Sequence, residues 1–242
     1  MVDIDYTTDD HEFRENDDYA RAKYDITLRW LGPARERRLL NIGCGAGLFN
    51  RLAHQAGFAV EACEPDPTAH RIALAAAPDG VVVHLGGLFD APMTPGADVV
   101  VMHDVLEHID NEASAVAELH RLVCAGGTVV ISVPALESLY GLHDERLGHH
   151  RRYTRRSLRS ALESHFVVRR MRYFGMSLIP VTLWFSRWRR RPYPTGVATG
   201  PSLIGRAFAL VCRGESFVPT PIGTSLVCEA SPAPTPARSA AT

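Results

Sequence analysis

The sequence has a single lysine, Lys23, among its 26 basic residues, and it has neither a CxxC pair nor a run of 18 apolar residues. An apolar run of that length is what a membrane-spanning helix requires, so no such helix is expected. The first residues are acidic, where a secretion signal would be basic and then apolar. The five cysteines are scattered, which predicts neither a disulfide framework nor a metal site. Together these absences indicate a reduced, cytoplasmic compartment.

Charge is almost balanced overall but unevenly distributed along the chain. The 242 residues are 46% apolar and 22% charged, with a formal net charge of −1, which is typical of one globular domain with a sizeable core. Residues 1–18 carry eight acids and one base, whereas residues 143–191 carry thirteen arginines and three acids. A uniform basic face for nucleic acid is therefore not expected, although a local one is possible.

Short apolar runs alternate with longer helical stretches from residue 37 onward. This alternation predicts an α/β fold with a doubly wound, seven-stranded parallel sheet. The expected strands are residues 37–43, 58–64, 81–85, 97–103, 128–134, 166–174 and 223–230. The expected helices are residues 19–30, 47–57, 67–77, 111–127 and 155–165, and residues 134–154 are expected to form a long loop.

A glycine-rich loop, Gly43-Cys44-Gly45-Ala46-Gly47, follows the first expected strand and leads into a helix. Glycines there permit a sharp turn and let backbone N–H groups approach a ligand at the helix N-terminus. Glu64 ends the second strand, 21 residues after Gly43, where a carboxylate can accept hydrogen bonds from an adenosine ribose. The third glycine of a dinucleotide motif is replaced by Leu48, which disfavours NAD.

Four segments in this order resemble the motifs of class I S-adenosylmethionine (SAM)-dependent methyltransferases. They are LLNIGCGAGLFN, EACEPDP, DVVVMHDVLEHIDN and RLVCAGGTVVISVP, and the resemblance covers about residues 35–174 and the last strand. The V-L-E-H turn and the segment HDERLGHHRRYTRRSL are similar to bacterial small-molecule methyltransferases of the ubiquinone-biosynthesis type.

The resemblance implies a Rossmann-like fold with SAM as the cofactor. The family commonly has Gly-Asp-Ala after the third strand, but Gly86-Gly87-Leu88 stands here, so adenine recognition falls to the Leu88 backbone or to Asp90. Cys44 is interpreted as a small side chain near the methionine moiety, not as a nucleophile. The cofactor-binding residues expected from the resemblance are Tyr19, Gly43, Cys44, Gly45, Glu64, Pro65, Gly87, Leu88, His103 and Asp104.

The expected organisation follows from the same motifs. Residues 37–174 are the SAM-binding core, and residues 223–230 are its last strand. Residues 1–36 form an N-terminal helical cap, residues 175–222 an insertion, and the Pro/Ala/Ser-rich residues 231–242 a disordered tail. The apolar, arginine-rich insertion is interpreted as a lid over the substrate pocket, with contact to a membrane surface as the alternative.

Three residues after the fifth strand are candidate catalytic bases: His143, His149 and Tyr153. They lie at the carboxyl edge of the sheet, and imidazole titrates close to working pH. The alternative is that the histidines fill gaps in the packing while the nearby arginines are solvated.

Methyl transfer from SAM to an oxygen, nitrogen or carbon atom of a small molecule is the expected function. The acceptor is expected to be apolar or anionic, in a bacterial secondary-metabolite, glycan or lipid pathway. Nucleic acid is not an expected partner, because no Asn-Pro-Pro-Tyr tetrad follows the fourth strand. Two alternatives stay open: a SAM-binding protein without methyl transfer, and a lipid or quinone methyltransferase at a membrane surface. The sequence does not indicate an oligomeric state.

Overall fold

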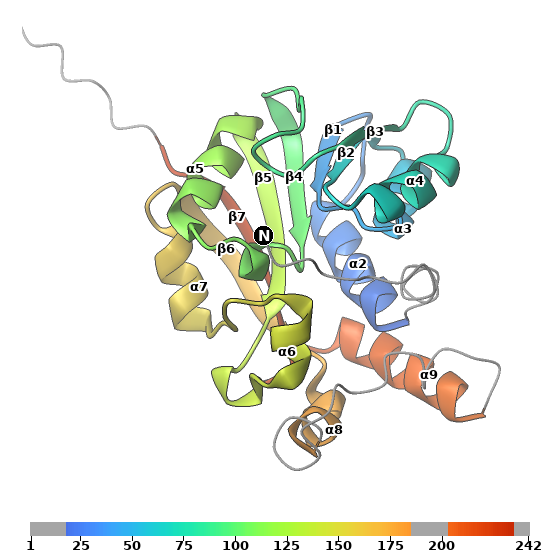
Figure 1. Ribbon diagram of the computed structural model, residues 1–242, viewed down its shortest axis with the longest axis vertical. Helices are drawn as coiled ribbons and strands as arrows, with labels where there is room; N and C mark the ends of the chain where they lie inside the picture. Colours follow the sequence, from blue (N-terminus) through green and yellow to red (C-terminus); the bar gives the residue numbers. More distant parts are fainter. Residues whose placement is uncertain (1–17, 185–202, 235–242) are drawn as a thin grey trace, which may run out of the picture.

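A seven-stranded mixed sheet with the order β3-β2-β1-β4-β5-β7-β6 runs through the computed structural model, which describes residues 18–184 and 203–234 (Figure 1). β7 is antiparallel to both of its neighbours, and the other strands run parallel to one another. The strands are β1 (Arg38–Ile42), β2 (Ala59–Glu64), β3 (Val82–Leu85), β4 (Ala97–His103), β5 (Val123–Pro134), β6 (Phe166–Phe174) and β7 (Ser225–Pro232).

The predicted α/β fold and its seven strands are confirmed, with two differences. β7 is antiparallel, whereas the alternation of runs predicts a parallel strand. The insertion leaves the sheet at the carboxyl end of β6, after Phe174, and re-enters it beside that same end of β6, at Ser225. β7 therefore has to run antiparallel to β6. β5 begins at Val123, before the predicted residue 128, because Val123 already pairs with Ala97 of β4.

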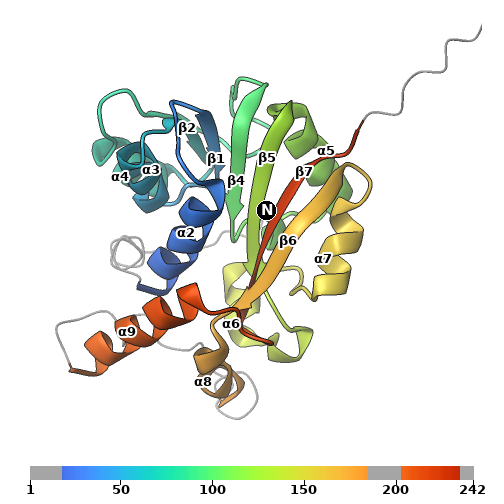
Figure 2. The same cartoon turned by 180° about the vertical axis from the view of Figure 1, so that it is seen from behind.

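Helices cover both faces of the sheet, as a doubly wound fold requires (Figures 1 and 2). One face is covered by α2 (Asp18–Leu31), α3 (Leu48–Gln55) and α4 (Pro67–Ala75), which contribute Ile26, Phe49 and Ala73 to one buried core. The other face is covered by α5 (Glu112–Leu122) and α7 (Arg155–Leu162), which contribute Leu119 and Leu158 to a second core.

Local capping signals set where several of these helices begin. Asp66 accepts a hydrogen bond from the N–H of Ala69 at 2.7 Å, and Pro67 occupies the first helical position of α4. Thr154 and Ser157 bond reciprocally at the start of α7. These helix starts agree with the predicted ones because their signals lie within a few residues.

Additional short helices lie along the carboxyl edge of the sheet. The segment expected as a long loop contains η2 (Glu137–Leu139) and α6 (Leu142–Leu147), and η1 (Leu106–His108) follows β4. The described part of the insertion forms η3 (Met176–Leu178), α8 (Ile179–Leu183) and α9 (Leu203–Phe217). Both views show α9 lying beside α2 (Figures 1 and 2). Residues 1–17, 185–202 and 235–242, which include most of the predicted tail, lie outside the described residues.

Two expectations drawn from the absences can be compared with the described residues. None of the described helices combines the length and the apolarity needed to cross a bilayer. All five cysteines are free thiols, as their spacing predicts, and four of them are buried.

Arg172 of β6 fastens the end of α9 to the sheet. Its buried guanidinium donates to the carbonyl oxygens of Ser216 at 3.0 Å, Glu215 at 2.6 Å and Val218 at 2.6 Å. The Glu215 carboxylate in turn accepts a hydrogen bond from the N–H of Met176 at 3.0 Å. One arginine therefore satisfies the carbonyl groups that the end of a helix leaves without intrahelical partners.

Replacing Arg172 by methionine should destabilise the protein by about 1.5–3 kcal/mol, because three carbonyl oxygens lose a charged donor. Urea unfolding measures the loss, and amide hydrogen exchange should locate it in α9. Arg169→Met is the matched control, because Arg169 lies exposed on the same strand and donates to the Ser231 hydroxyl. An equal loss of stability in the two variants would contradict the fastening role.

Candidate functional site

The glycine loop that joins β1 to α3 has a backbone that side chains would disturb. Gly43 has a φ of 68°, and a Cβ there would lie 2.4 Å from Cγ2 of Val105. Gly45 has a φ of 55°, and nothing lies within 4 Å of where its Cβ would be. The first glycine is thus required by packing, and the second leaves open space in which a ligand can approach the backbone.

Glu64 lies against this loop at the end of β2. Its Oε2 accepts a hydrogen bond from the N–H of Gly45 at 2.7 Å, and its Oε1 accepts one from the N–H of Asp66 at 3.0 Å. The side chain is buried, but each carboxylate oxygen has a second lone pair that can accept a further bond. The structure therefore brings two predicted cofactor-binding elements into direct contact, the glycine loop after β1 and the acid at the end of β2.

Pro65, Gly87 and Leu88 lie next to Glu64. The N–H of Gly86 donates to the Glu64 carbonyl oxygen at 3.0 Å, and a Cβ on Gly87 would lie 3.9 Å from Cβ of Pro65. The Leu88 side chain is buried in the core on the α5 side of the sheet. The backbone of residue 88, but not its side chain, thus remains a candidate for adenine recognition.

Cys44 is buried within the glycine loop, and its Sγ lies 3.6 Å from the Gly45 carbonyl oxygen. Burial raises the pKa of the thiol to about 12, so it is protonated at neutral pH. A protonated thiol is a poor nucleophile, which agrees with the interpretation of Cys44 as a small side chain.

His103 ends β4 with its ring enclosed on several sides. Its Nδ1 lies 3.0 Å from the Ser132 hydroxyl, and its Nε2 lies 3.3 Å from the Thr27 hydroxyl. The ring centroid lies 4.9 Å from that of Tyr24 and 5.0 Å from that of Phe49. Burial lowers the pKa of His103 to about 3, so the imidazole is neutral and does not serve as a proton donor at neutral pH.

Asp104 forms an ion pair with the buried Lys23 of α2, and its carboxylate, which is partly exposed, also accepts a hydrogen bond from the Ser132 hydroxyl at 3.2 Å. Burial acts to raise the pKa of Asp104, but Lys23 outweighs it and holds this pKa at about 2. The backbone of Asp104 has a φ of 53°, which residues with a Cβ rarely adopt. Lys23 was not among the predicted site residues; its being the only lysine in the chain was the available signal.

Tyr19 connects the start of α2 to the start of β7. Its hydroxyl lies 2.7 Å from the Thr224 hydroxyl and donates to the Ser225 hydroxyl at 2.9 Å. Its ring lies 4.8 Å from that of Phe174. Tyr19 therefore holds the N-terminal helix beside the site, whereas the resemblance implies a direct contact with the cofactor.

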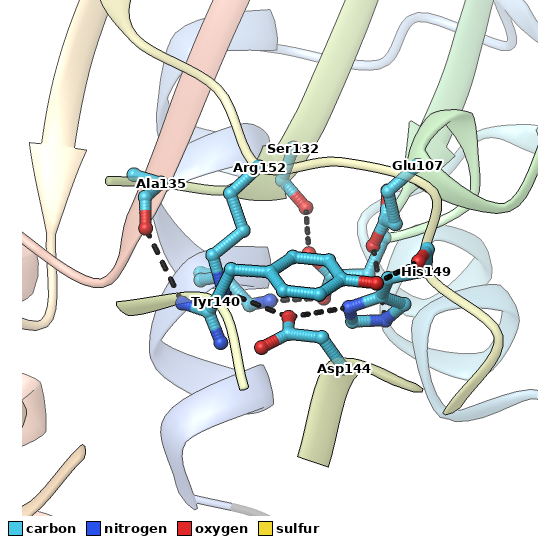
Figure 3. A network of polar contacts seen from close by, with 9 residues as sticks. Glu107, Ser132, Ala135, Tyr140, Asp144, His149 and Arg152 are labelled. Atoms are coloured by element: carbon cyan, nitrogen blue, oxygen red, sulfur yellow. Dashed lines mark hydrogen bonds and ion pairs between the residues drawn. The ribbon is translucent and has the colours of Figure 1, made fainter. Parts of the chain in front are cut away.

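A second polar group lies beyond Asp104, and we call it the Glu107 cluster: Glu107, His108, Asp144, His149 and Arg152. Figure 3 shows Glu107, Asp144, His149 and Arg152, and the ring of His108 lies against that of His149. Nδ1 of His149 lies 2.8 Å from Oδ1 of Asp144, and Nε of Arg152 donates to the same oxygen at 2.8 Å. Burial acts to raise the pKa of Asp144, but the bonds from His149 and Arg152 outweigh it and lower this pKa. The imidazole of His149 is thereby fixed with Nε2 directed at Glu107, 3.9 Å from its Oε1.

Glu107 is fully buried, and neither of its carboxylate oxygens has a hydrogen-bond partner among the described residues. Burial, and then the nearby negative charge of Asp104, raise the pKa of Glu107 well above its ordinary value. Its carbonyl oxygen accepts a hydrogen bond from the N–H of His150 at 2.8 Å, which holds residues 149–152 against η1. Glu107 was missed as a site residue, because a carboxylate in a short turn is usually solvated.

The three predicted catalytic residues occupy different surroundings. His149 belongs to the Glu107 cluster, and His143 lies half-buried on α6 beside Asp144. Tyr153 is buried in the core, where its hydroxyl donates to Oε1 of Glu112 at 2.6 Å. Burial raises the pKa of Tyr153 above its ordinary value, which makes the phenol a poor base. The geometry thus supports His149 and gives no support to Tyr153.

A family model described as a methyltransferase domain matches residues 12–165. The chain belongs to this methyltransferase family. Membership implies SAM as the cofactor, as the four motifs predict, and the strand order with an antiparallel seventh strand agrees with it.

Similar proteins support the same assignment. An uncharacterized methyltransferase of Mycobacterium tuberculosis is 29% identical over 121 residues, which is 50% of this chain and 46% of the relative. A ubiquinone biosynthesis O-methyltransferase of Pseudomonas aeruginosa is 33% identical over 101 residues, 40% of this chain and 44% of the relative. The matches thus span about half the length of these curated relatives. A chain from the complex between the Haloferax volcanii Trm112 methyltransferase activator and a methyltransferase superimposes with a TM-score of 0.65 at 16% identity, covering 93% of this chain and 95% of that one, and shows the shared fold.

The buried, neutral His103 should make the methyltransferase domain sensitive to acid. In the unfolded chain the imidazole of His103 binds a proton below about pH 6.5. In the folded protein burial lowers its pKa to about 3, because the raising effect of Asp104 is smaller than that of burial and Lys23 also lowers the pKa. Its contribution to stability is therefore complete above pH 6.5 and falls by about 1.4 kcal/mol per pH unit below it.

His103→Gln should flatten this dependence. Urea unfolding at about pH 8, 6 and 5 gives the slope, and the difference at pH 8 isolates the packing cost, because both side chains are neutral there. Equal slopes in the two proteins would show that His103 takes up its proton in the folded state as well.

Proposed function

We propose that this protein transfers the methyl group of SAM to a small-molecule acceptor. The observation that carries this proposal is the contact between the Gly45 N–H and the Glu64 carboxylate, which joins the glycine loop of β1 to the acid of β2. The loop lies where the strand order reverses, between β1 and β4, and open α/β sheets bind ligands at that point. The methyl group is already activated on the sulfonium, so the protein mainly has to align the reactants and exclude water.

The residues on the cofactor side suit SAM. We assign the ribose hydroxyls to Glu64, the adenine to the backbone of Leu88 with Pro65 and Gly87 beside it, and the methionine moiety to the 43–47 loop. His103 and Asp104 would border the methionine end. Contacts with Lys23, Thr27 and Ser132 hold these two residues in place. Tyr19 would act indirectly, by keeping α2 over this end.

The acceptor would lie at the Glu107 cluster, which follows β4 directly at the carboxyl edge. Of the three predicted catalytic residues we retain His149, whose ring Asp144 holds beside Glu107. A surface cavity of about 310 Å³ adjoins the cluster and is lined by Glu137, Tyr140, His150, Arg151 and Arg152. Its arginines suit an anionic group on the acceptor.

An oxygen acceptor is favoured over nitrogen and carbon by the O-methyltransferase from Pseudomonas aeruginosa among the relatives. A secondary-metabolite, glycan or lipid pathway in a bacterium remains our proposal for the context. The described residues of the insertion, 175–184 and 203–222, would cover the acceptor as a lid. The alternative of a membrane-surface enzyme draws on exposed apolar side chains in and next to α8 and α9, among them Val181, Trp184, Leu210 and Phe217.

Glu64→Gln should weaken SAM binding by about 10- to 150-fold, which corresponds to the loss of about 1.5–3 kcal/mol from a charge-assisted bond to a ribose hydroxyl. Calorimetric titration of the purified protein with SAM measures this change. Glu61→Gln is the matched control, because Glu61 lies on the same strand but faces His84 and the N–H of Thr94. Equal affinities in wild type and Glu64→Gln would remove the ribose role.

Methyl transfer itself is tested by the release of S-adenosylhomocysteine in the presence of phenols, alcohols and amines with and without an anionic group. We expect turnover with an oxygen acceptor, and a loss of about 100-fold or more in His149→Gln at unchanged SAM affinity. Tyr153→Phe is the control and should retain turnover. SAM binding without product from any acceptor would favour the alternative of a binding protein, and equal losses in both variants would argue against a specific role for His149.

A further inference from the structure

Glu107 differs from the two other acids around it, Asp104 and Asp144. Asp104 is paired with Lys23, and Asp144 is paired with Arg152. Glu107 is fully buried with no hydrogen-bond partner for either oxygen among the described residues, and His149 approaches its Oε1 no closer than 3.9 Å. A carboxylate left in this state costs several kcal/mol, so Glu107 either keeps a proton, as its raised pKa indicates, or binds another positive group in its place.

The atoms around this carboxylate are typical metal ligands. Glu107, His108 and His149 each offer one ligand atom, and these atoms all lie within 4.8 Å of one another. Ligand atoms at about 2.0–2.2 Å from one ion are at most about 4.4 Å apart, so small side-chain rotations would bring all three onto an ion. The rings of His108 and His149 already meet edge to face, with their centroids 4.7 Å apart.

The surroundings also have the second layer of contacts that metal-binding histidines need. Because Nδ1 of His149 is bonded to Asp144, its Nε2 is the nitrogen left to face Glu107 (Figure 3). A carboxylate that holds one nitrogen of a histidine while the other binds an ion is the usual arrangement in metal sites. Arg152 in turn fixes Asp144, and the bond from the N–H of His150 to the Glu107 carbonyl oxygen fixes the two ligand segments relative to each other.

We propose that Glu107, His108 and His149 form a binding site for one divalent cation. Two imidazole nitrogens and one carboxylate oxygen are the donor set that Zn²⁺, Mn²⁺ and Fe²⁺ accept, whereas Mg²⁺ and Ca²⁺ prefer oxygen atoms alone. The sequence did not predict this site, because its ligands come from two segments 41 residues apart and contain no cysteine.

Three protein ligands leave coordination positions open for an oxygen atom of the acceptor. An ion there would lower the pKa of a bound hydroxyl group, so that the acceptor can give its proton to solvent water without needing His149 to take it. His149 then acts as a ligand. This use of the ion rests on the proposed function, but the binding of the ion does not and is measured separately.

The site is tested with the full chain, stripped with a chelator and titrated calorimetrically with Zn²⁺ alone and with Mn²⁺ alone. We expect one equivalent to bind to the wild type, and the affinity to fall by about 100-fold or more in Glu107→Gln and in His149→Gln. His120→Gln is the matched control, because the rings of His120 and His165 form another histidine pair, 5.2 Å apart, away from the cluster. This control should bind the ion as the wild type does.

Thermal unfolding provides a second measurement that does not depend on activity. The ion should raise the Tm of wild type and His120→Gln but not that of Glu107→Gln. Without the ion, Glu107→Gln should be at least as stable as the wild type, since the amide has the shape of the carboxyl group and cannot take on a charge in the interior. The proposal is overturned if no saturable binding occurs, or if Glu107→Gln binds the ion and responds to it as the wild type does. Methyl transfer that survives removal of the ion would leave the proposed function standing and remove the ion's part in it.

Discussion

The ion pair between the buried Lys23 and Asp104 is the interaction on which the arrangement of the site depends. It joins α2 to the residue that follows β4, two segments about 80 positions apart in the chain. The pair adds little net stability, because the desolvation of Lys23 offsets most of the Coulomb attraction. Its geometry is specific, however, because displacing α2 would separate the buried Lys23 ammonium from the Asp104 carboxylate. The pair therefore fixes where the helix lies, and with it Tyr19 and Thr27.

α2 transmits this position to the elements around it. Its Thr27 hydroxyl meets the ring of His103, its Tyr19 hydroxyl meets the start of β7, and its Arg29 donates to the carbonyl oxygen of Ser216 in α9. Since Arg172 of β6 holds the same end of α9, the described part of the insertion is fixed from the N-terminal helix and from the far edge of the sheet. The cofactor side and the proposed lid are thus built on one support.

The parts of the fold that the sequence predicts are those whose causes are local. β1 and β4 were predicted because each is a short, mainly apolar run buried on both faces, and α4 and α7 because caps lie within a few residues of their starts. The direction of β7 and the early start of β5 depend on pairing with distant strands, which periodicity does not encode.

In the candidate site, the glycine loop and Glu64 could be predicted locally, since each lies at the end of a strand of one parallel unit. Lys23, Asp144 and Arg152 do not, because their roles arise from contacts between separate segments. Tyr153 shows the limit most clearly, because its place in the sequence suits a base but its hydroxyl is bonded to Glu112 within the core.

Burial acts on three ionisable residues near the end of β4 with three different outcomes. His103 is neutral, and two hydroxyl groups meet its ring nitrogens, so its burial is satisfied within the fold. Asp104 is charged, and Lys23 compensates it. Glu107 has a pKa raised well above its ordinary value, and no described residue bonds to its carboxyl oxygens. Buried polar groups in folded proteins are almost always satisfied, and the exceptions gather where a ligand completes them. The first two residues are therefore accounted for by the packing of α2 against the sheet, whereas the oxygens of the third are left for the cation that we propose to bind there. This is why the acceptor side of the site, and not the cofactor side alone, is where the chemistry particular to this protein is to be sought.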